Sequence, residues 1–455
     1  MTARAAERLP PDTTAALRRA GVPAAALSVV VHDLATDSKV LRWQEDQPMN
    51  PASLLKLLTT AAALDRLGPA YTWATPVWLT GPVRDGVLEG SLAIQGRGDP
   101  KFTLERVWGL LRRLQQLGVR EIRGDIVLDN SAFAVPDAHP GEFDGEPLRP
   151  YNVRPAALLF SFRSLVYTFT PDAAAGVARV SAEPPLAGQQ TDRSVPLAAG
   201  PCADWRGALK ASFEPGRTRF GGSYAAACGE GAWPVADPEP ATFEARLLLG
   251  LWREMGGTLG GSVREGTAPA LQPPSFELRS PPLAELVRDI NKFSNNLMAQ
   301  QLYYTLALQA RPGERATPDS ARETLQQWLA ERSGPLGDNV VLENGSGLSR
   351  GTRLSAARLA RVLVQAWDSP VMSELMSSLP ISGLDGTLRR ARLSTGRAHL
   401  KTGSLRDVTA LAGYVLSNSG RRYVVVAIVN HDKAGAARPA LEALVQWTLR
   451  DAPAF

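Results

Sequence analysis

A serine and a lysine three positions apart, Ser53 and Lys56, stand at the start of an apolar stretch that runs to Leu67. On a helix, this spacing places both side chains on one face. The free amide groups of a first helical turn favour negative charge beside the serine, and apolar neighbours favour the neutral amine of the lysine. A neutral amine can take the proton of a serine hydroxyl, so the two residues are a candidate nucleophile and base. The alternative is a serine that caps the helix and a lysine that extends to solvent.

A second polar group, Ser294-Asn295-Asn296, opens another segment with helical patterning. The hydroxyl of Ser294 and the amide of Asn296 are groups that can contact a substrate. Helix capping explains residues of these types equally well.

A third polar group, Lys401-Thr402-Gly403-Ser404, ends a predicted strand. Lys401 and Thr402 can hold a carboxylate, and Gly403 allows a ligand to approach the backbone closely. The alternative is an exposed edge strand that runs into a turn.

The motifs of several other enzyme classes are absent. The sequence contains no HExxH, GxxxxGK[ST] or GxSxG pattern. A Ser-His-Asp triad would have to assemble from distant segments, without support from any local motif. We expect no metal site, because the four histidines do not have the spacing of metal ligands. They are His32, His139, His399 and His431.

The composition is that of an ordinary globular protein, with 44% hydrophobic and 21% charged residues among 455. No stretch reaches the ~18 apolar residues of a membrane-spanning helix. The formal net charge is +5 and the pI about 9.3, and we expect the excess to be spread along the chain. Without a basic tail or a basic run interleaved with aromatics, nucleic acid is a poor candidate partner. The surplus fits either an anionic polymer substrate or solubility alone.

Two cysteines and the first residues bear on the cellular compartment. Cys202 and Cys228 either form a disulfide in an oxidising compartment or remain two free thiols. The segment from Met1 to Asp12 lacks the ~7–15 apolar residues at the core of a signal peptide. The chain is then either cytosolic or the mature form of an exported protein, and composition does not decide between these alternatives.

The residue patterns at both ends of the chain predict antiparallel strands and helices that cover them. Because each end supplies only part of a sheet, we predict one α+β domain that is completed when the two ends meet. The predicted strands span residues 25–32, 40–43, 399–404, 411–416 and 423–429, and the predicted helices span residues 13–20, 54–67, 282–287, 294–308, 318–332 and 434–450.

The middle of the chain must then be an insertion, with boundaries near residues 75 and 270. A predicted helix over residues 102–118 and a strand over 122–128 give its first part α/β character, whereas residues 150–274 read as strands and loops rich in proline and glycine. The predicted organisation is a catalytic domain of residues 1–75 and 270–455, a mostly β domain II of residues 76–98 and 165–269, and an α/β domain III of residues 99–164.

The three polar groups occur in the order SxxK, SxN and KTG, which is the signature set of the penicillin-recognising serine acyltransferases. The long interval from Ser53 to Ser294 resembles the layout of the class C low-molecular-mass penicillin-binding proteins. This is the D-Ala-D-Ala carboxypeptidase/endopeptidase family typified by penicillin-binding protein 4 (peptidase family S13). The resemblance extends from about Leu9 to Leu449. Segments that carry it are Gly96–Pro100, Ile122–Val127, Pro282–Glu285, Asn291–Gln300, Gly345–Ser349, Asp385–Leu388 and Lys401–Leu405.

The resemblance implies a transpeptidase-like α+β domain, an antiparallel sheet with helices on both faces, in which two smaller domains are nested. It implies that Ser53 attacks the peptide carbonyl of a stem that ends in D-alanyl-D-alanine, with Lys56 as the base. Ser294 and Lys401 would pass a proton to the leaving amine, and water would hydrolyse the acyl-enzyme. No metal or organic cofactor is required.

The resemblance also implies which groups hold the substrate. The Asn296 amide would hold the substrate backbone, and Thr402 and Ser404, on either side of Gly403, would hold the terminal carboxylate. The backbone N–H groups of Ser53 and Ser404 would form the oxyanion hole. A β-lactam would follow the same path and stall as a slow ester.

The implied partners are peptidoglycan stem peptides and β-lactams, and the implied location is the bacterial periplasm. Residues Trp447 to Phe455 show no anchor pattern, so association with the envelope would be peripheral at most. The oligomeric state has no signature in the sequence. One departure is Asn344, where the family usually has Asp; this position lies outside the acyl-transfer groups. The alternatives are a β-lactamase, an esterase or D-aminopeptidase of the same fold, and a catalytically silent peptidoglycan-binding scaffold.

Overall fold

The computed structural model describes residues 6–269 and 271–452, and these residues form two compact units. The first unit runs up to Thr72 and resumes at Pro281. The second unit runs from Trp73 to Ser280. Among the described residues, no helix is both long enough and apolar enough to cross a membrane.

The first unit is built on one antiparallel sheet with the strand order β2-β1-β22-β21-β20. The N-terminal strand β1 pairs directly with the C-terminal strand β22, so the two ends of the chain meet in one sheet as predicted. The strands are β1 (Leu27–Asp33), β2 (Ser38–Trp43), β20 (Ala398–Leu405), β21 (Val408–Leu416) and β22 (Arg422–Asn430).

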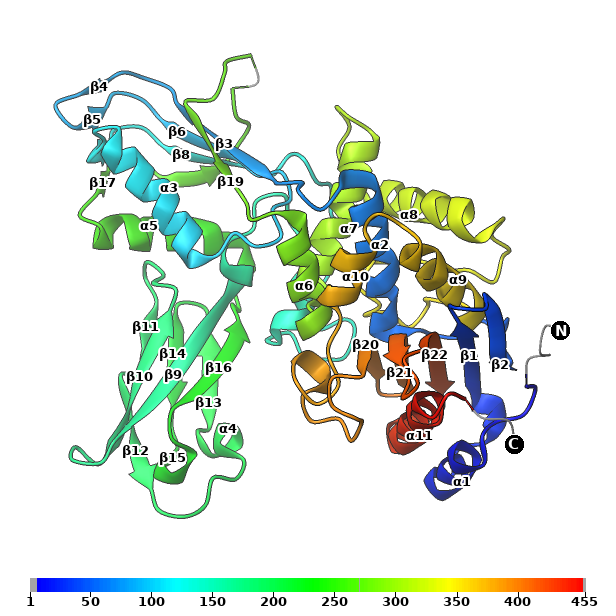
Figure 1. Cartoon of the computed structure of the whole chain (residues 1–455). Coiled ribbons are helices and arrows are strands. Elements are labelled where there is room, and N and C mark those ends of the chain that lie inside the picture. The colour runs from blue at the N-terminus through cyan, green and yellow to red at the C-terminus, as the bar shows by residue number, and fades with distance from the viewer. Residues whose placement is uncertain (1–5, 270, 453–455) are drawn as a thin grey trace. The chain divides into compact units, whose positions relative to one another are not determined.

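Helices cover both faces of this sheet (Figure 1). Residues Val424 to Val429 of β22 are all buried, which a strand shows when both of its faces are covered. One face shares a core with α1 (Pro11–Ala20) and α11 (Arg438–Leu449), and the other packs against α9 (Ala356–Trp367). This arrangement confirms the predicted α+β class.

The remaining helices of the first unit surround α2 (Leu55–Leu67). Every residue of α2 from Leu55 to Leu64 is buried, because the helix is apolar on all sides and lies inside the helical layer. Besides α9, it packs against α6 (Leu283–Phe293), α7 (Asn296–Ala310), α8 (Pro318–Ser333) and α10 (Met372–Ser378).

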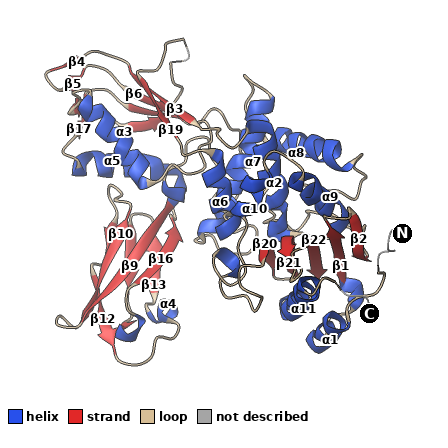
Figure 2. Ribbon diagram, in the orientation of Figure 1, coloured by secondary structure: helices blue, strands red, loops and turns tan. Residues whose placement is uncertain are grey.

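The second unit contains an α/β part and a mostly β part, which Figure 2 distinguishes by helix and strand content. In the α/β part, α3 (Leu104–Gln116) and α5 (Phe243–Glu254) accompany two sheets of order β18-β8-β6-β3-β19 and β17-β7-β5-β4. Their strands are β3 (Ala74–Leu79), β4 (Val83–Arg84), β5 (Val87–Leu88), β6 (Leu92–Gln95), β7 (Glu121–Ile122), β8 (Ile126–Asp129), β17 (Thr258–Leu259), β18 (Val263–Glu265) and β19 (Phe276–Arg279).

The mostly β part has sheets of order β15-β12-β10-β9-β16 and β11-β14-β13, with the short helix α4 (Trp205–Ala208). Aromatic side chains fill its core, among them Tyr167, Phe169 and Tyr224. Its strands are β9 (Ser164–Asp172), β10 (Val177–Glu183), β11 (Gln190–Thr191), β12 (Ser194–Ala198), β13 (Ala211–Glu214), β14 (Arg217–Phe220), β15 (Tyr224–Ala225) and β16 (Gly231–Ala236).

The sheet pairing of the second unit differs from the predicted subdivision. The predicted border between residues 76–98 and 99–164 separates β6 from β8, yet these two strands pair in one sheet. Strand β18, much later in the chain, pairs with the other edge of β8. Local composition does not reveal which distant strands pair, so a border drawn from it can pass through a sheet.

Helix α5 lies in a segment that we predicted as strands and loops. Prolines and glycines on both sides of it dominate the composition of that region. Within the segment, however, Phe243, Leu247, Leu248, Leu251 and Trp252 are all buried and follow the spacing of one helix face. This helical periodicity indicates α5, and it was missed because the prediction relied on the composition of the whole region.

Cys202 and Cys228 form a disulfide in the mostly β part of the second unit. The structure therefore selects the first of the two alternatives for these residues. Disulfides persist in oxidising compartments and are rare in the cytosol.

Candidate active site

Ser53 lies in a tight turn that precedes α2. It belongs to the 3-10 turn η2 (Ala52–Leu54), and Ala52 has a φ of 47°, in the left-handed region that residues with a Cβ avoid. The Ala52 N–H donates to Asn50 Oδ1 at 2.9 Å, and the Asn50 N–H donates to Asn430 Oδ1, at the end of β22, at 2.7 Å. The sheet therefore holds this turn, and the half-buried Ser53, in one position.

Lys56 follows one helical turn later, and its side chain is completely buried. Its Nζ lies 2.9 Å from Ser53 Oγ, 2.6 Å from Asn296 Oδ1 and 2.6 Å from the carbonyl oxygen of Ser346. Burial, and after it the charge of Lys401, holds the pKa of the Lys56 amine well below its usual 10.5. A neutral amine has two N–H groups and one lone pair. If the N–H groups donate to Asn296 and Ser346, the lone pair faces Ser53 Oγ and can accept its proton.

Lys401 and Ser294 form a second pair, from β20 and from the junction of α6 and α7. Ser294 ends α6 with a φ of 56°, and the side chain of Asn295 caps α7 by accepting the Met298 N–H. Lys401 Nζ donates to Ser294 Oγ at 2.8 Å and to the carbonyl oxygen of Thr402 at 2.8 Å. Burial lowers the pKa of Lys401 to about 7. Near neutral pH this amine can therefore both accept and donate a proton.

Gly403 allows strand β20 to approach the turn that carries Ser53. A Cβ at this position would lie 2.7 Å from the carbonyl oxygen of Pro51, closer than a van der Waals contact allows. On the same strand, Thr402 Oγ1 donates to Thr387 Oγ1 at 2.8 Å, and Ser404 is exposed. The glycine therefore sets the distance between the KTG strand and the serine turn.

Strand β20 is an edge strand of its sheet. The first part of its outer edge bonds to a neighbouring segment, since the Leu400 N–H donates to the carbonyl oxygen of Pro380 at 2.9 Å. From Lys401 to Leu405, no further strand pairs with this edge in the part of the chain that the structure describes. An extended peptide can add there as a further strand.

The structure brings five of the eight predicted site residues into direct side-chain hydrogen bonds. They form two groups, Ser53 with Lys56 and Asn296, and Ser294 with Lys401. The other three lie on β20, and within residues 6–269 and 271–452 no hydrogen bond joins the Ser404 side chain to the rest. The charge of Lys401 lowers the pKa of Lys56, so the two groups lie within electrostatic range of each other.

The loop around Asn344 supports this site, and we assigned it no role from the sequence. Asn344 Oδ1 accepts the N–H groups of Ser346 and Gly347, both at 3.1 Å, and its Nδ2 donates to the carbonyl oxygen of Leu348 at 2.7 Å. These bonds fix the Ser346 carbonyl that Lys56 contacts. A carboxylate could not make the bond to Leu348, so the departure from the usual Asp adds a donor to this loop.

Replacing Gly347 by alanine is expected to displace the serine turn. Gly347 has a φ of 80°, and a Cβ there would lie 1.9 Å from the carbonyl oxygen of Ala52. We expect a loss of about 3 kcal/mol of unfolding free energy and an acylation rate reduced roughly 100-fold. The control is Gly68→Ala, because Gly68 has a φ of 79° but open space at its Cβ. Equal effects of the two substitutions in denaturant unfolding and penicillin acylation would show that contact with the turn is unimportant.

An ion pair outside the predicted set links α6 to the segment before β20. Lys292 Nζ lies 2.6 Å from Asp385 Oδ2, and Asp385 Oδ1 accepts the Ile381 N–H at 2.8 Å. Burial alone would raise the pKa of Asp385, but its hydrogen bonds with Lys292 and Ile381 hold that pKa below the usual 3.8. The charged carboxylate therefore joins the helix that ends at Ser294 to the segment whose Thr387 bonds to Thr402. Both partners lie in segments that resemble the family, and this resemblance was the sequence signal that could have identified them.

The buried amine of Lys401 makes the stability of the protein depend on pH. Its pKa falls from 10.5 to about 7 on folding, so the unfolded chain binds more protons between these values. The contribution of Lys401 to stability is fully present above pH 10.5 and is lost as the pH falls through 7. As the pH rises through this range, the free energy of unfolding of wild type should increase relative to that of Lys401→Met by up to about 1.4 kcal/mol per pH unit. Urea unfolding from pH 6.5 to 9.5 tests this, with Lys39→Met as control, because Lys39 is partly exposed. A constant difference would contradict it.

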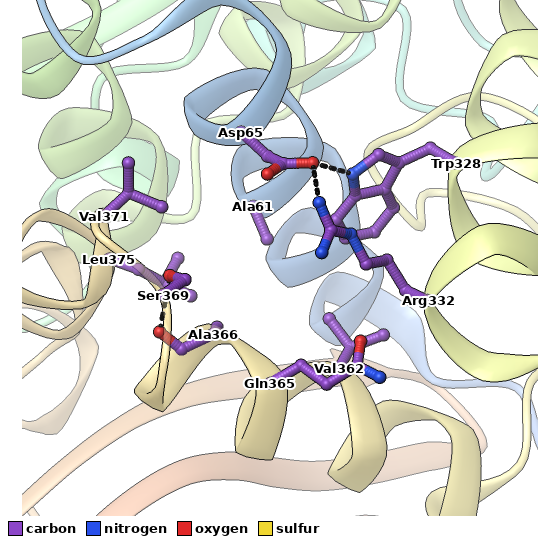
Figure 3. A pocket seen from close by; sticks show the side chains of 10 residues that line it. All are labelled: Ala61, Asp65, Trp328, Arg332, Val362, Gln365, Ala366, Ser369, Val371 and Leu375. Carbon is purple, nitrogen blue, oxygen red and sulfur yellow. Dashed lines mark hydrogen bonds and ion pairs between the residues drawn. The ribbon is translucent and has the colours of Figure 1, made fainter.

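A small cavity near the other end of α2 is separate from these residues. Figure 3 shows it beside Asp65, whose Oδ2 accepts from Trp328 Nε1 at 2.8 Å and from Arg332 Nη2 at 2.6 Å. Its volume is about 30 Å³, and none of the eight predicted site residues lines it. A space of this size holds a water molecule but no substrate. Among the described residues, no group of three or more His, Cys, Asp or Glu side chains could hold a metal ion.

Known proteins resemble the chain over almost its whole length. The D-alanyl-D-alanine carboxypeptidase of Actinomadura sp. (strain R39) is 29% identical over 459 residues, which cover 95% of this chain and 82% of the relative. The crystal structure of penicillin binding protein 4 (dacB) from Haemophilus influenzae superposes with a TM-score of 0.75 at 22% identity, over 93% of this chain and 96% of that one. A structure of the same protein complexed with a novel β-lactam superposes with a TM-score of 0.73 at 21% identity, over 97% of this chain and 100% of that one.

The solved structures establish the fold, and a family model establishes the family. The model of the D-Ala-D-Ala carboxypeptidase 3 (S13) family matches residues 14–450. This match confirms the family that the SxxK, SxN and KTG motifs predicted. The chain belongs to the D-Ala-D-Ala carboxypeptidase 3 (S13) family.

Proposed function

We propose that this chain is a serine D-Ala-D-Ala carboxypeptidase and endopeptidase. It acts on peptidoglycan stem peptides and on their D-Ala cross-links through an acyl-enzyme, and it binds β-lactams covalently. The observation that carries the proposal is the completely buried Lys56, whose amine lies 2.9 Å from Ser53 Oγ. A buried lysine with a lowered pKa beside a serine hydroxyl is the arrangement that serine activation by an amine requires.

In the acylation step, Ser53 Oγ attacks the carbonyl carbon of the penultimate D-alanine, and its proton passes to Lys56 Nζ. The new oxygen–carbon bond gives a tetrahedral intermediate, whose oxyanion the N–H groups of Ser53 and Ser404 would stabilise. The carbon–nitrogen bond then breaks. Ser294, bonded to Lys401 at 2.8 Å, passes a proton to the leaving amine. Water hydrolyses the resulting ester and restores the Ser53 hydroxyl.

The edge of β20 supports a defined substrate orientation. A stem peptide that pairs with the outer edge after Lys401 would run past Ser53, because Gly403 packs against the turn that holds it. Asn296 would contact the substrate amide, and Thr402 and Ser404 the terminal carboxylate. In an endopeptidase reaction, the leaving amine belongs to the cross-linked neighbouring stem instead of a free D-alanine.

We further propose that the protein works in the periplasm. The disulfide between Cys202 and Cys228 supports an oxidising compartment. The substrate, a polymer outside the cytoplasmic membrane, is found in the same compartment. No metal or organic cofactor enters the proposed reaction, and association with the envelope would be peripheral.

The test is release of D-alanine from a peptide ending in D-Ala-D-Ala, with the same peptide ending in L-Ala-L-Ala as the control. The proposal expects D-alanine release from the first peptide alone and cleavage of cross-linked muropeptide dimers. Rapid hydrolysis of benzylpenicillin without peptide cleavage would instead indicate a β-lactamase. No reaction with either substrate would indicate a catalytically silent scaffold.

A further inference from the structure

The segment between α10 and β20 concentrates positive charge. Residues 386–397 contain four arginines and no acidic residue, a charge of +4 in a chain whose formal net charge is +5. The expectation that the cationic excess is spread along the chain does not hold for this segment. In Figure 1 it is the orange segment that precedes β20.

This segment is held firmly against the site-bearing elements. Leu388 and Leu393 are buried in the core that the sheet shares with α1 and α11. The Gly396 N–H donates to the carbonyl oxygen of Ser382 at 2.9 Å, and Ser382 Oγ donates to the carbonyl oxygen of Ser394 at 2.6 Å. These contacts close the segment on itself, so the side chains between the two leucines project from a fixed backbone.

Three of the four arginines have no side-chain partner among the residues that the structure describes. Arg389, Arg390 and Arg392 are exposed, and within the described ranges 6–269 and 271–452 their side chains make no hydrogen bond or ion pair. Arg397, by contrast, is half-buried and donates to the carbonyl oxygen of Ser417 at 3.0 Å. Three cations within four positions repel one another, and no described residue pairs with their side chains, so an external anion would lower their energy.

Two large apolar side chains are exposed on segments next to the site. Phe293, next to Ser294, is 71% exposed, and Leu384, next to Asp385, is 54% exposed. The ion pair of Lys292 with Asp385 holds these two positions near each other. The segment also contacts the KTG strand through the bond between Thr387 and Thr402.

We infer that this surface, formed by Phe293, Leu384, Arg389, Arg390 and Arg392, binds the peptidoglycan polymer beyond the bond being cut. The inference rests on the proposed function. A stem that ends in D-alanine carries a free terminal carboxylate, so a glycan strand with many stems is a polyanion that complements the three unpaired arginines. Phe293 and Leu384 contribute apolar contact next to Ser294 and Asp385, where the bound stem joins the rest of the polymer.

Continuity with the site favours this polymer over an anionic membrane. The arginine segment is bonded to Thr402, and Phe293 adjoins Ser294, so the occupant of the surface must leave the substrate path open. A bound strand whose own stem enters the site does so. A lipid bilayer seated on Phe293 would cover the approach to Ser294.

The test compares Arg389→Gln/Arg390→Gln/Arg392→Gln with Arg8→Gln/Arg18→Gln/Arg19→Gln. The second variant removes the same charge from three exposed arginines in or near α1. Binding to isolated peptidoglycan sacculi and kcat/KM on polymeric peptidoglycan are measured at 20 and 300 mM NaCl. We expect the first variant to lose roughly tenfold in both at low salt and to lose its salt dependence. The α1 variant should behave as wild type.

Three further measurements separate polymer binding from an effect on the catalytic site and from membrane binding. They are cleavage of a short peptide, acylation by benzylpenicillin, and binding to vesicles of phosphatidylglycerol. Cleavage of a short D-Ala-D-Ala peptide and acylation by benzylpenicillin should be unchanged in the arginine variant, and a loss of either would show that the cluster acts on the catalytic site itself. Unchanged binding to sacculi would overturn the inference, and so would a loss confined to vesicles of phosphatidylglycerol. If wild type cleaves no short peptide, the proposed function fails instead, which is a distinct result.

Discussion

Replacing Ser53 by alanine is expected to abolish D-alanine release, with a loss of at least about 10⁴-fold in kcat/KM. The substitution removes the nucleophile, whereas the fold should persist because the Ser53 hydroxyl makes one hydrogen bond with the described residues, to Lys56. We expect a change of about 1 kcal/mol in the free energy of unfolding. Peptide cleavage and urea unfolding measure the two effects separately.

The matched control for Ser53 is Ser373→Ala, on the surface of α10, which should retain full activity. Measurable peptide cleavage by a correctly folded Ser53→Ala variant would contradict the assignment of Ser53 as the nucleophile. In that case another serine in the site, such as Ser294, would have to be the nucleophile. Ser294 would then give its proton to a base instead of passing one to the leaving amine.

Replacing Lys56 by arginine is the prediction with the second largest effect. Arginine retains hydrogen-bond donors, but it stays protonated and cannot serve as the base. We expect the rate of acylation by benzylpenicillin to fall about 10³-fold. The control is Lys39→Arg, because Lys39 is a partly exposed lysine paired with Glu45. Retained acylation by Lys56→Arg would exclude Lys56 as the base.

The pH profile of the wild-type rate gives an independent view of Lys56. The neutral amine is the active form, so acylation should rise with pH and level off above the pKa of Lys56. Since burial and the charge of Lys401 lower that pKa well below 10.5, the plateau should begin far below pH 10.5. A rate that continues to rise up to pH 10.5 would show an ordinary lysine at this position.

Much of the first unit could be predicted from its sequence because the signals there are local. Ser53 and Lys56 are one helical turn apart, and the strands at both ends have strong apolar patterns. The apolar helix also indicated a neutral Lys56, and the structure lowers its pKa for the same physical reason, burial. The family resemblance then linked three motifs that are distant in sequence.

The features that could not be predicted depend on contacts between distant residues. The carbonyl of Ser346 bonds to Lys56 from 290 positions away, and no local pattern marks a backbone carbonyl as part of a site. The pairing of β6 with β8 could not be predicted for a related reason, since the sequence of a short strand carries little information about which strand it pairs with. Asn344 looked like a minor departure from the family, yet its amide positions the loop that supplies the Ser346 carbonyl.

The mass of the intact protein after exposure to benzylpenicillin shows whether Ser53 forms a covalent acyl-enzyme. We predict that wild type gains the mass of one penicillin, that peptide mapping places it on Ser53, and that Ser53→Ala gains none. An adduct on another residue, or on Ser53→Ala, would contradict the assignment of the nucleophile. No adduct together with intact drug would contradict an accessible, reactive serine in this site.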